Sequence, residues 1–164
     1  MDPSTQATIE ELIRTGEYAE ARGILEREIG ETPHDSELHA RLGFVFHSGG
    51  EHADAVKHYA DAAWILVIEA ADRGRGGPGD SFEQVTTEFG AMLPMVRTAC
   101  FDAVRAFLGR NLDYARIRTE TGVSLLELGD ISTARRAFCE AVEFLPAGAS
   151  YDEPWMWLTR IEDM

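Results

Sequence analysis

The sequence predicts an all-helical protein built from short helix pairs that repeat along the chain. The first observation is a repeated pattern: a glycine, an alanine five residues later, and a large apolar residue four further on. It occurs three times, as Gly16-Ala21-Leu25, Gly50-Ala55-Tyr59 and Gly129-Ala134-Phe138. The second observation is composition, because hydrophobic residues make up 45% of the 164 residues and can form a buried core.

The spacing of the pattern predicts how the copies are arranged. The interval from Gly16 to Gly50 matches the period of about 34 residues that is typical of stacked helix–turn–helix repeats. The interval from Gly16 to Gly129 is not a whole multiple of that period, so the sequence predicts an insertion before the last copy. In each copy the glycine can end a helix in the left-handed conformation. The small residues allow neighbouring helices to approach to about 8–10 Å.

A related pattern precedes the last two turns. It reads Leu42-Gly43-x2-Phe46 in one copy and Thr121-Gly122-x2-Leu125 in the other. With it, the three copies resemble the tetratricopeptide-repeat family. The resemblance covers residues 2–35, 36–69 and 115–148, and it implies antiparallel helix pairs. It further implies that these pairs stack into a short right-handed superhelix with a concave and a convex face.

The remaining segments are assigned from their composition, and together they predict one helical-repeat domain over residues 1–164. The apolar run through Ile68 predicts a long second helix that reaches Ala71. Residues 70–80 contain four glycines and a proline, and we expect a loop. Residues 81–114 would form a degenerate pair, with Pro94 as a helix break or a kink. Pro146 ends the last pair, and residues 152–164 predict a capping helix.

The expected cap presents Trp155, Leu158 and Ile161 on one helical face. We interpret this face as the cover of the open end of the stack. Trp155 and Trp157 could instead dock a partner or a second copy, so a homodimer through either end of the stack stays an alternative.

Charge and motifs exclude several classes of function. The formal charge of −14 makes nucleic acid and anionic membrane poor partners. The N-terminus lacks a signal-peptide pattern, so we expect a cytoplasmic protein with Cys100 and Cys139 as reduced, buried thiols. We found no nucleophile elbow, phosphate-binding glycine loop or cysteine–histidine arrangement, and we therefore expect no enzyme and no cofactor.

The family resemblance implies a partner site on the concave face. There the first helix of each pair lines a groove, and the residues not used for packing within the pair face the ligand. Transferred to this chain, the lining comprises Phe44, His47, Ser48, Phe82, Val85, Phe89, Met92, Thr119, Val123 and Leu126. The alternative is that Phe82, Phe89 and Met92 simply pack inward as core.

The sequence therefore favours an adaptor that binds an apolar or amphipathic segment of another protein, and the surrounding acidity would favour a basic one. A small acidic chaperone for a secreted or assembling protein is an alternative, although the insertion at residues 70–80 departs from the uninterrupted repeats of such chaperones. All five histidines lie between His34 and His58, but their spacing does not predict a metal site. A regulatory subunit that senses metal or pH through them is a second alternative.

Overall fold

The computed structural model describes residues 2–74, 87, 104–110 and 112–162, and every regular element in these ranges is helical. The prediction of an all-helical fold is confirmed. The helices are α1 (Pro3–Thr15), α2 (Tyr18–Glu31), α3 (Ser36–Ser48), α4 (His52–Gly74), α7 (Leu112–Glu127), α8 (Ile131–Glu143) and α9 (Glu153–Glu162). Residues 104–108 add a short helical segment.

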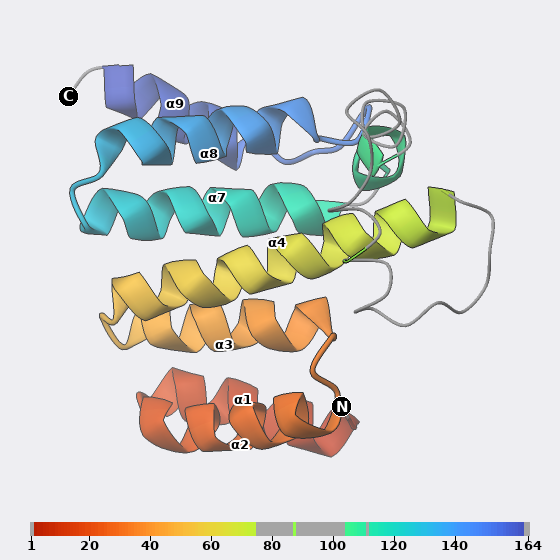
Figure 1. Cartoon of the computed structure of the whole chain (residues 1–164). Helices are drawn as coiled ribbons and strands as arrows, with labels where there is room; N and C mark the ends of the chain where they lie inside the picture. Colours follow the sequence, from red (N-terminus) through yellow and green to blue (C-terminus); the bar gives the residue numbers. More distant parts are fainter. Residues whose placement is uncertain (1, 75–86, 88–103, 111, 163–164) are drawn as a thin grey trace.

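The helices lie as successive pairs, one above the next (Figure 1). α1 packs against α2, α3 against α4 and α7 against α8, and contacts between α2 and α3 and between α4 and α7 join the pairs. α9 packs on α8 at one end of the stack. Because the pairs are stacked in series, their apolar side chains are buried between successive layers.

Glycine and an aromatic ring meet where the two helices of a pair cross. A Cβ atom added to Gly43 would lie 2.8 Å from Cδ1 of Tyr59, and one added to Gly122 would lie 2.5 Å from Cε1 of Phe138. Both rings are buried. The sequence interval from Gly43 to Gly122 equals the interval from Tyr59 to Phe138, so this one offset relates equivalent positions of the α3/α4 and α7/α8 pairs.

The turns within the pairs are made by glycines, as expected. Gly16 and Gly50 have φ values of 80°, and Gly129 has a φ of 78°, in the left-handed region that L side chains rarely adopt. Asp35 then begins α3 by accepting hydrogen bonds from the backbone N–H groups of Glu37 and Leu38, at 2.9 and 3.2 Å.

The inserted segment does not separate the second pair from the last. α4 continues to Gly74, past the point where we expected the loop to begin, and α7 packs directly against it. Within the predicted degenerate unit, Val104 and Leu108 are buried in the same core cluster as Ile68. Phe82, Val85, Phe89, Met92, Pro94 and Cys100 lie outside the described residues.

The C-terminal helix covers α8 and packs Leu158 and Ile161 against it as predicted, but Trp155 does not belong to the packing face. Pro154 and Ile161 are buried, and the Trp157 ring stacks on Phe138 with centroids 5.9 Å apart. Trp155, which we had placed on the packing face, is 56% exposed. Pro154 takes the first buried position of the helix, so the packing face begins one residue before Trp155.

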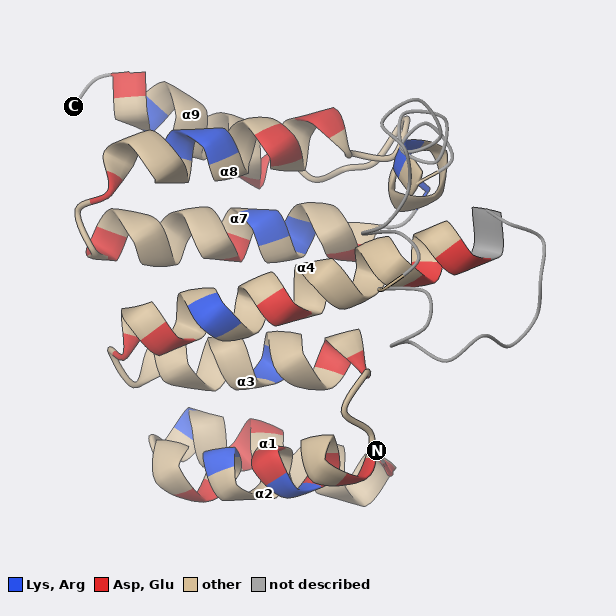
Figure 2. Cartoon of the chain, in the orientation of Figure 1, with Lys and Arg blue, Asp and Glu red and all other residues tan. Residues whose placement is uncertain are grey.

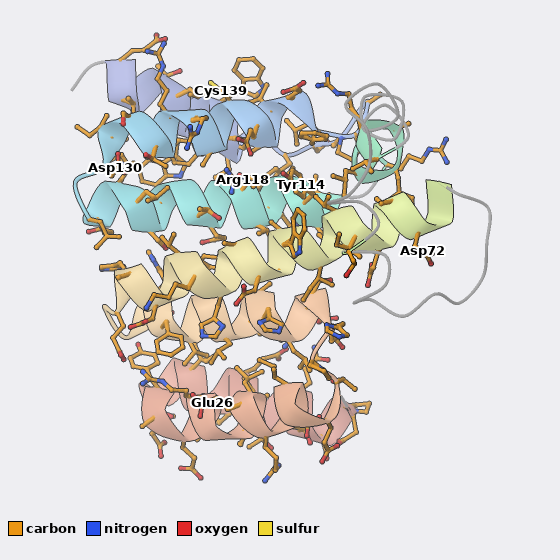
Figure 3. All side chains as sticks on the ribbon, in the orientation of Figure 1. Glu26, Asp72, Tyr114, Arg118, Asp130 and Cys139 are labelled. Atoms are coloured by element: carbon orange, nitrogen blue, oxygen red, sulfur yellow. The ribbon has the colours of Figure 1, made fainter. Side chains whose placement is uncertain are left out.

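The outer surface carries a thiol and many carboxylates. Cys139 is exposed, on the side of α8 away from α7 (Figure 3), so its predicted burial is wrong. The buried side of α8 is already formed by its alanines and Phe138. Acidic residues occur on each labelled helix (Figure 2). Within the described ranges, we see no helix with the length and apolar character to cross a membrane.

A groove between the first helices of the pairs

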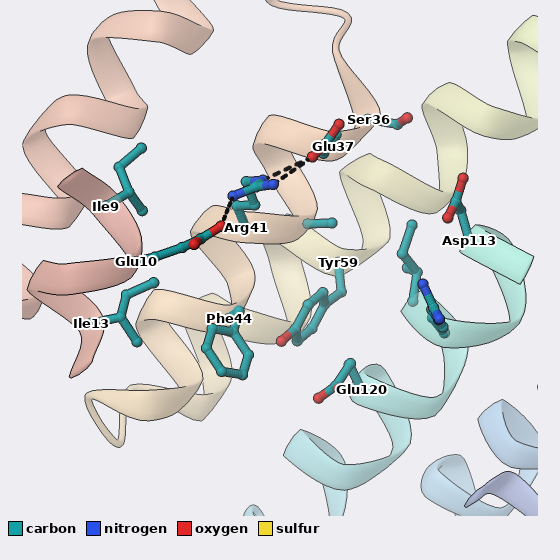
Figure 4. Close-up of a pocket in the computed structure, with 13 residues that line it drawn as sticks. Ile9, Glu10, Ile13, Ser36, Glu37, Arg41, Phe44, Tyr59, Asp113 and Glu120 are labelled. Carbon is teal, nitrogen blue, oxygen red and sulfur yellow. Dashed lines mark hydrogen bonds and ion pairs between the residues drawn. The ribbon is translucent and has the colours of Figure 1, made fainter. Parts of the chain in front are cut away.

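A cavity of about 530 Å³ lies along the first helices of the three pairs that the structure describes (Figure 4). α1, α3 and α7 supply nearly all of its lining, and α4 supplies Tyr59. The lining residues are Ile9, Glu10, Ile13, Ser36, Glu37, Ala40, Arg41, Phe44, Tyr59, Asp113, Arg116, Ile117 and Glu120. We call this cavity the groove.

The groove has an apolar surface that includes one exposed aromatic ring. Phe44 is 43% exposed, although its neighbours Val45 and Phe46 on α3 are buried. Ile13 and Ile117 line the same cavity from α1 and α7. An aromatic side chain held half-exposed among buried and partly buried aliphatic ones can pack against an apolar side chain of another molecule.

Charged side chains surround the apolar part, and carboxylates outnumber cations among them. Arg41 on α3 is already engaged, because its guanidinium lies 2.7 Å from Glu37 and 3.8 Å from Glu10 of the first pair. These two ion pairs link a side chain of α1 to α3. Since two acidic groups share one cation there, the groove presents a net negative potential to an approaching ligand.

Two polar groups in the groove, one half-buried and one buried, lack full compensation. Burial raises the pKa of the Glu120 carboxyl, and the nearby Glu153 carboxylate adds to this effect. Burial also raises the pKa of Tyr59, and the charge of Glu120 raises it further. The Tyr59 ring is 1% exposed, and its hydroxyl has no hydrogen-bond partner among the described residues. A ligand could supply a cation for the carboxylate.

The residues that we predicted from the family resemblance are distributed over two regions. Phe44 lines the groove. His47 lies on the same helix but turns to α7, where its Nδ1 is 2.9 Å from Oγ of Ser124. Val123 and Leu126 pack with the cluster that includes α8 and α9. Their assignment to a partner site stays a prediction, as does that of the four residues between 82 and 92, which lie outside the described part of the chain.

Most of the lining was not predicted from the sequence. The repeated pattern did not single out Ile9 or Ile13 on α1, Arg41 on α3 or Glu120 on α7. A signal was present, because groove residues recur every three or four positions along each first helix. That spacing identifies a face, but it does not show where along each helix the groove crosses it.

Four of the five histidines form two pairs within the α3/α4 hairpin. Nδ1 of His47 is 3.3 Å from Nδ1 of His52 at the turn. Farther along the hairpin, the rings of His39 and His58 have centroids 5.9 Å apart. Burial lowers the pKa of both His47 and His58, and the neighbouring histidine lowers each further. Neither pair was predicted from the sequence.

Stacked antiparallel helix pairs with a groove along the first helices define a class of helical-repeat binding protein. Residues 7–75 match the family model of the tetratricopeptide repeat. This match covers less than half of the chain and supports a tetratricopeptide-repeat family, as the repeated residues indicated. Repeats of this kind are typically non-catalytic interaction modules. No curated protein matches the chain.

Proposed function

We propose that the groove binds an apolar or amphipathic segment of a partner protein, and that the chain acts as an adaptor. The observation that carries this proposal is the half-exposed Phe44 ring within a cavity built by the first helices of all three pairs. Repeats of the tetratricopeptide family act in protein–protein interaction, which supports a protein as the ligand.

The charge of the groove argues for a basic segment. A lysine or arginine of the ligand would compensate Glu120, whose carboxyl is held in an unfavourable environment by burial and by Glu153. The overall charge of −14 would speed the approach of such a segment. The cavity of about 530 Å³ has room for a few side chains, so one or two apolar anchors next to a basic residue would fit it.

A displayed library of random peptides tests both parts of the proposal. Selection on the wild-type chain should enrich peptides in which apolar anchors stand near lysine or arginine. The Phe44→Asp variant should bind the selected peptides about 30-fold more weakly, because it removes an aromatic contact and adds a charge that disfavours the apolar anchor. Affinity of synthetic peptides measured by fluorescence anisotropy gives the comparison.

Met156→Asp is the matched control, since it places the same charge at an exposed apolar residue of α9, outside the groove. Its affinity should equal that of the wild type. Equal weakening by both variants would show a general charge effect. If Phe44→Asp binds as the wild type does, or if enriched peptides are acidic, the groove is not the partner site.

A further inference from the structure

His39, His58 and Asp61 lie together on the α3/α4 hairpin, apart from the residues that line the groove. Each offers one ligand atom, and these atoms all lie within 4.8 Å of one another. Nδ1 of His39 is 3.9 Å from Oδ2 of Asp61. Around a tetrahedral zinc ion, ligand atoms at about 2.0–2.1 Å from the metal are about 3.3 Å from each other. Small side-chain rotations would therefore bring the three atoms to coordination distance.

The hydrogen bonding of His39 prepares one of its nitrogens for a metal. Its Nε2 lies 3.1 Å from the carbonyl oxygen of Pro33, in the connection between α2 and α3. Because a carbonyl only accepts, Nε2 carries the proton and donates it, which leaves Nδ1 with a free lone pair. A backbone carbonyl that fixes the tautomer in this way is a common outer partner of a metal-bound histidine. This Nδ1 is buried and has no hydrogen-bond partner in the described part of the chain.

The ring of His58 is also held in place. It stacks on Phe46 with centroids 5.1 Å apart and an angle of 7° between the planes. Its Nδ1, like that of His39, is buried without a hydrogen-bond partner from any residue that the structure describes. Two imidazole nitrogens that are buried without hydrogen bonds lower the stability of the fold unless a ligand binds them. Asp61 is 59% exposed at its side chain and lies one turn after His58, so it can move toward an ion.

The charges around the cluster favour a cation. Asp61 and Asp54 on α4 and Glu26 on α2 all act on His58 with negative charge, although Lys57 pairs with Asp54 at 2.7 Å. The positive Arg22 of α2 lies over the other ring of this stack, Phe46, and is paired with Glu51. The carboxylates thus outnumber the cations that face the site.

The equivalent positions of the last helix pair show how the two helices are joined by residues that could not bind a metal ion together. At the sequence offset that relates Gly43 to Gly122, His39, His58 and Asp61 correspond to Arg118, Ala137 and Glu140. There, Nε of Arg118 is 2.8 Å from the Glu140 carboxylate, an ion pair without regular hydrogen-bond geometry, and the alanine is buried. A simple ion pair therefore suffices to join the helices at this point. The α3/α4 pair has a third ligand-type side chain where the fold needs only a methyl group.

We propose that His39, His58 and Asp61 form a binding site for a divalent transition-metal ion, zinc by preference, with water as the fourth ligand. Two imidazoles and one carboxylate match the ligands that zinc takes in proteins. The bound ion would tie α3 to α4 and, through His39, to the Pro33 carbonyl. This site is independent of the proposed adaptor function of the groove.

Titration of the chelator-treated full chain with zinc chloride, followed by calorimetry, tests the proposal. The wild type should bind one zinc ion per chain, and its Tm should rise by several degrees at saturating zinc. Cobalt(II) should produce the visible absorption bands of a four-coordinate ion. No binding tighter than about 1 mM would overturn the proposal, as would binding of several ions of equal, weak affinity over the acidic surface.

The triple variant H39R/H58A/D61E installs the residues of the last pair. It should lose zinc binding by about 100-fold or more while its circular dichroism stays that of the wild type. Asp61→Asn, at an exposed position, should weaken binding by about tenfold and covers the case in which the triple variant fails to fold. The control H47A/H52A removes the other histidine pair and should bind as the wild type does. If this control loses the ion, or if Asp61→Asn binds unchanged, the proposed site is wrong.

Discussion

The α3/α4 and α7/α8 pairs share one packing scheme and differ in the polar groups placed on it. In both, a glycine meets an aromatic ring at the helix crossing. At equivalent positions, α7/α8 has the Arg118–Glu140 ion pair, and α3/α4 has His39 with Asp61. The first arrangement places its opposite charges at ion-pair distance, although Nε of Arg118 makes no hydrogen bond of regular geometry in the described ranges. The second leaves imidazole nitrogens unpartnered within the described residues, so this pair has groups available for ligands.

The ring at each crossing shows the same contrast. Phe138 is fully buried, stacks on Trp157 of the C-terminal helix and, being a phenylalanine, carries only apolar atoms. Tyr59, its equivalent, has a buried hydroxyl at the wall of the groove, without a hydrogen-bond partner in the described ranges. A buried unpartnered group costs stability. The α3/α4 pair, at the centre of the groove, therefore leaves more buried polar atoms without hydrogen bonds than the α7/α8 pair does, among the described residues.

The largest expected effect tests the shared part of this comparison. Gly122→Ala and Gly43→Ala should each lower the free energy of unfolding by about 2 kcal/mol, because the new methyl overlaps a ring in a packed core. Gly122→Ala should cost slightly more, since its Cβ would lie closer to the ring, at 2.5 Å against 2.8 Å. Urea denaturation measures both.

Gly23→Ala provides the control, as α2 leaves open space around that position. It should raise the free energy of unfolding by about 1 kcal/mol, because alanine favours the helix. A gain of similar size at Gly43 or Gly122 would mean that the rings move aside freely and that close packing does not explain these glycines.

Exchanging the two aromatic residues tests the difference between the pairs, with a smaller expected effect. Tyr59→Phe removes the unpartnered hydroxyl and should stabilise the chain by about 1 kcal/mol. Phe138→Tyr buries a new hydroxyl under Trp157 and should destabilise it by about 1.5 kcal/mol. Thermal unfolding measures the two changes. Loss of stability in Tyr59→Phe would show that the native hydroxyl already has a favourable interaction.

Much of the fold could be predicted from local sequence because few residue types fit its special positions. The turn glycines require positive φ, and the crossing glycines face rings, so both recur at fixed spacing. Burial of single side chains on the outer helices was harder to predict. The apolar stripe of α9 follows Pro154 and Trp157 instead of Trp155, and Cys139 lies opposite the buried side of α8. Helical spacing alone allows either face of such a helix.

The groove could be predicted as a surface but not residue by residue. On α3 its lining runs from Ser36 to Phe44, while on α7 it runs from Asp113 to Glu120. Counted by equivalent positions, Glu120 corresponds to Arg41, so the groove crosses α7 about one turn nearer the start of the helix. Transferring the same repeat positions to each helix therefore selects Val123 instead of Glu120. The oblique path arises from the angle between packed helices, which the sequence of one pair does not contain.

The smallest expected effect concerns pH, and it again separates the two pairs, because the sequences of α7 and α8 contain no histidine. Burial lowers the pKa of His58 from its ordinary value of 6.5, and His39 lowers it further, against the opposing charges of Asp61, Asp54 and Glu26. Below pH 6.5 the unfolded chain then binds more protons than the folded one, and stability falls as the pH drops toward the folded-state pKa. The effect is small because the ring is only half-buried.

Urea denaturation in the presence of chelator, at about pH 7.5 and about pH 5.5, measures this effect. The wild type should lose more stability on acidification than H39R/H58A/D61E, in which this histidine pair is absent. Subtracting the two curves removes the contribution of groups that both chains share. One of them is Glu120, whose raised pKa makes the stability rise on acidification, opposite to the effect of His58. Parallel curves would mean that His58 binds protons equally in the folded and unfolded chain. The two imidazoles would then be accessible to solvent, and their burial would no longer favour a bound ligand.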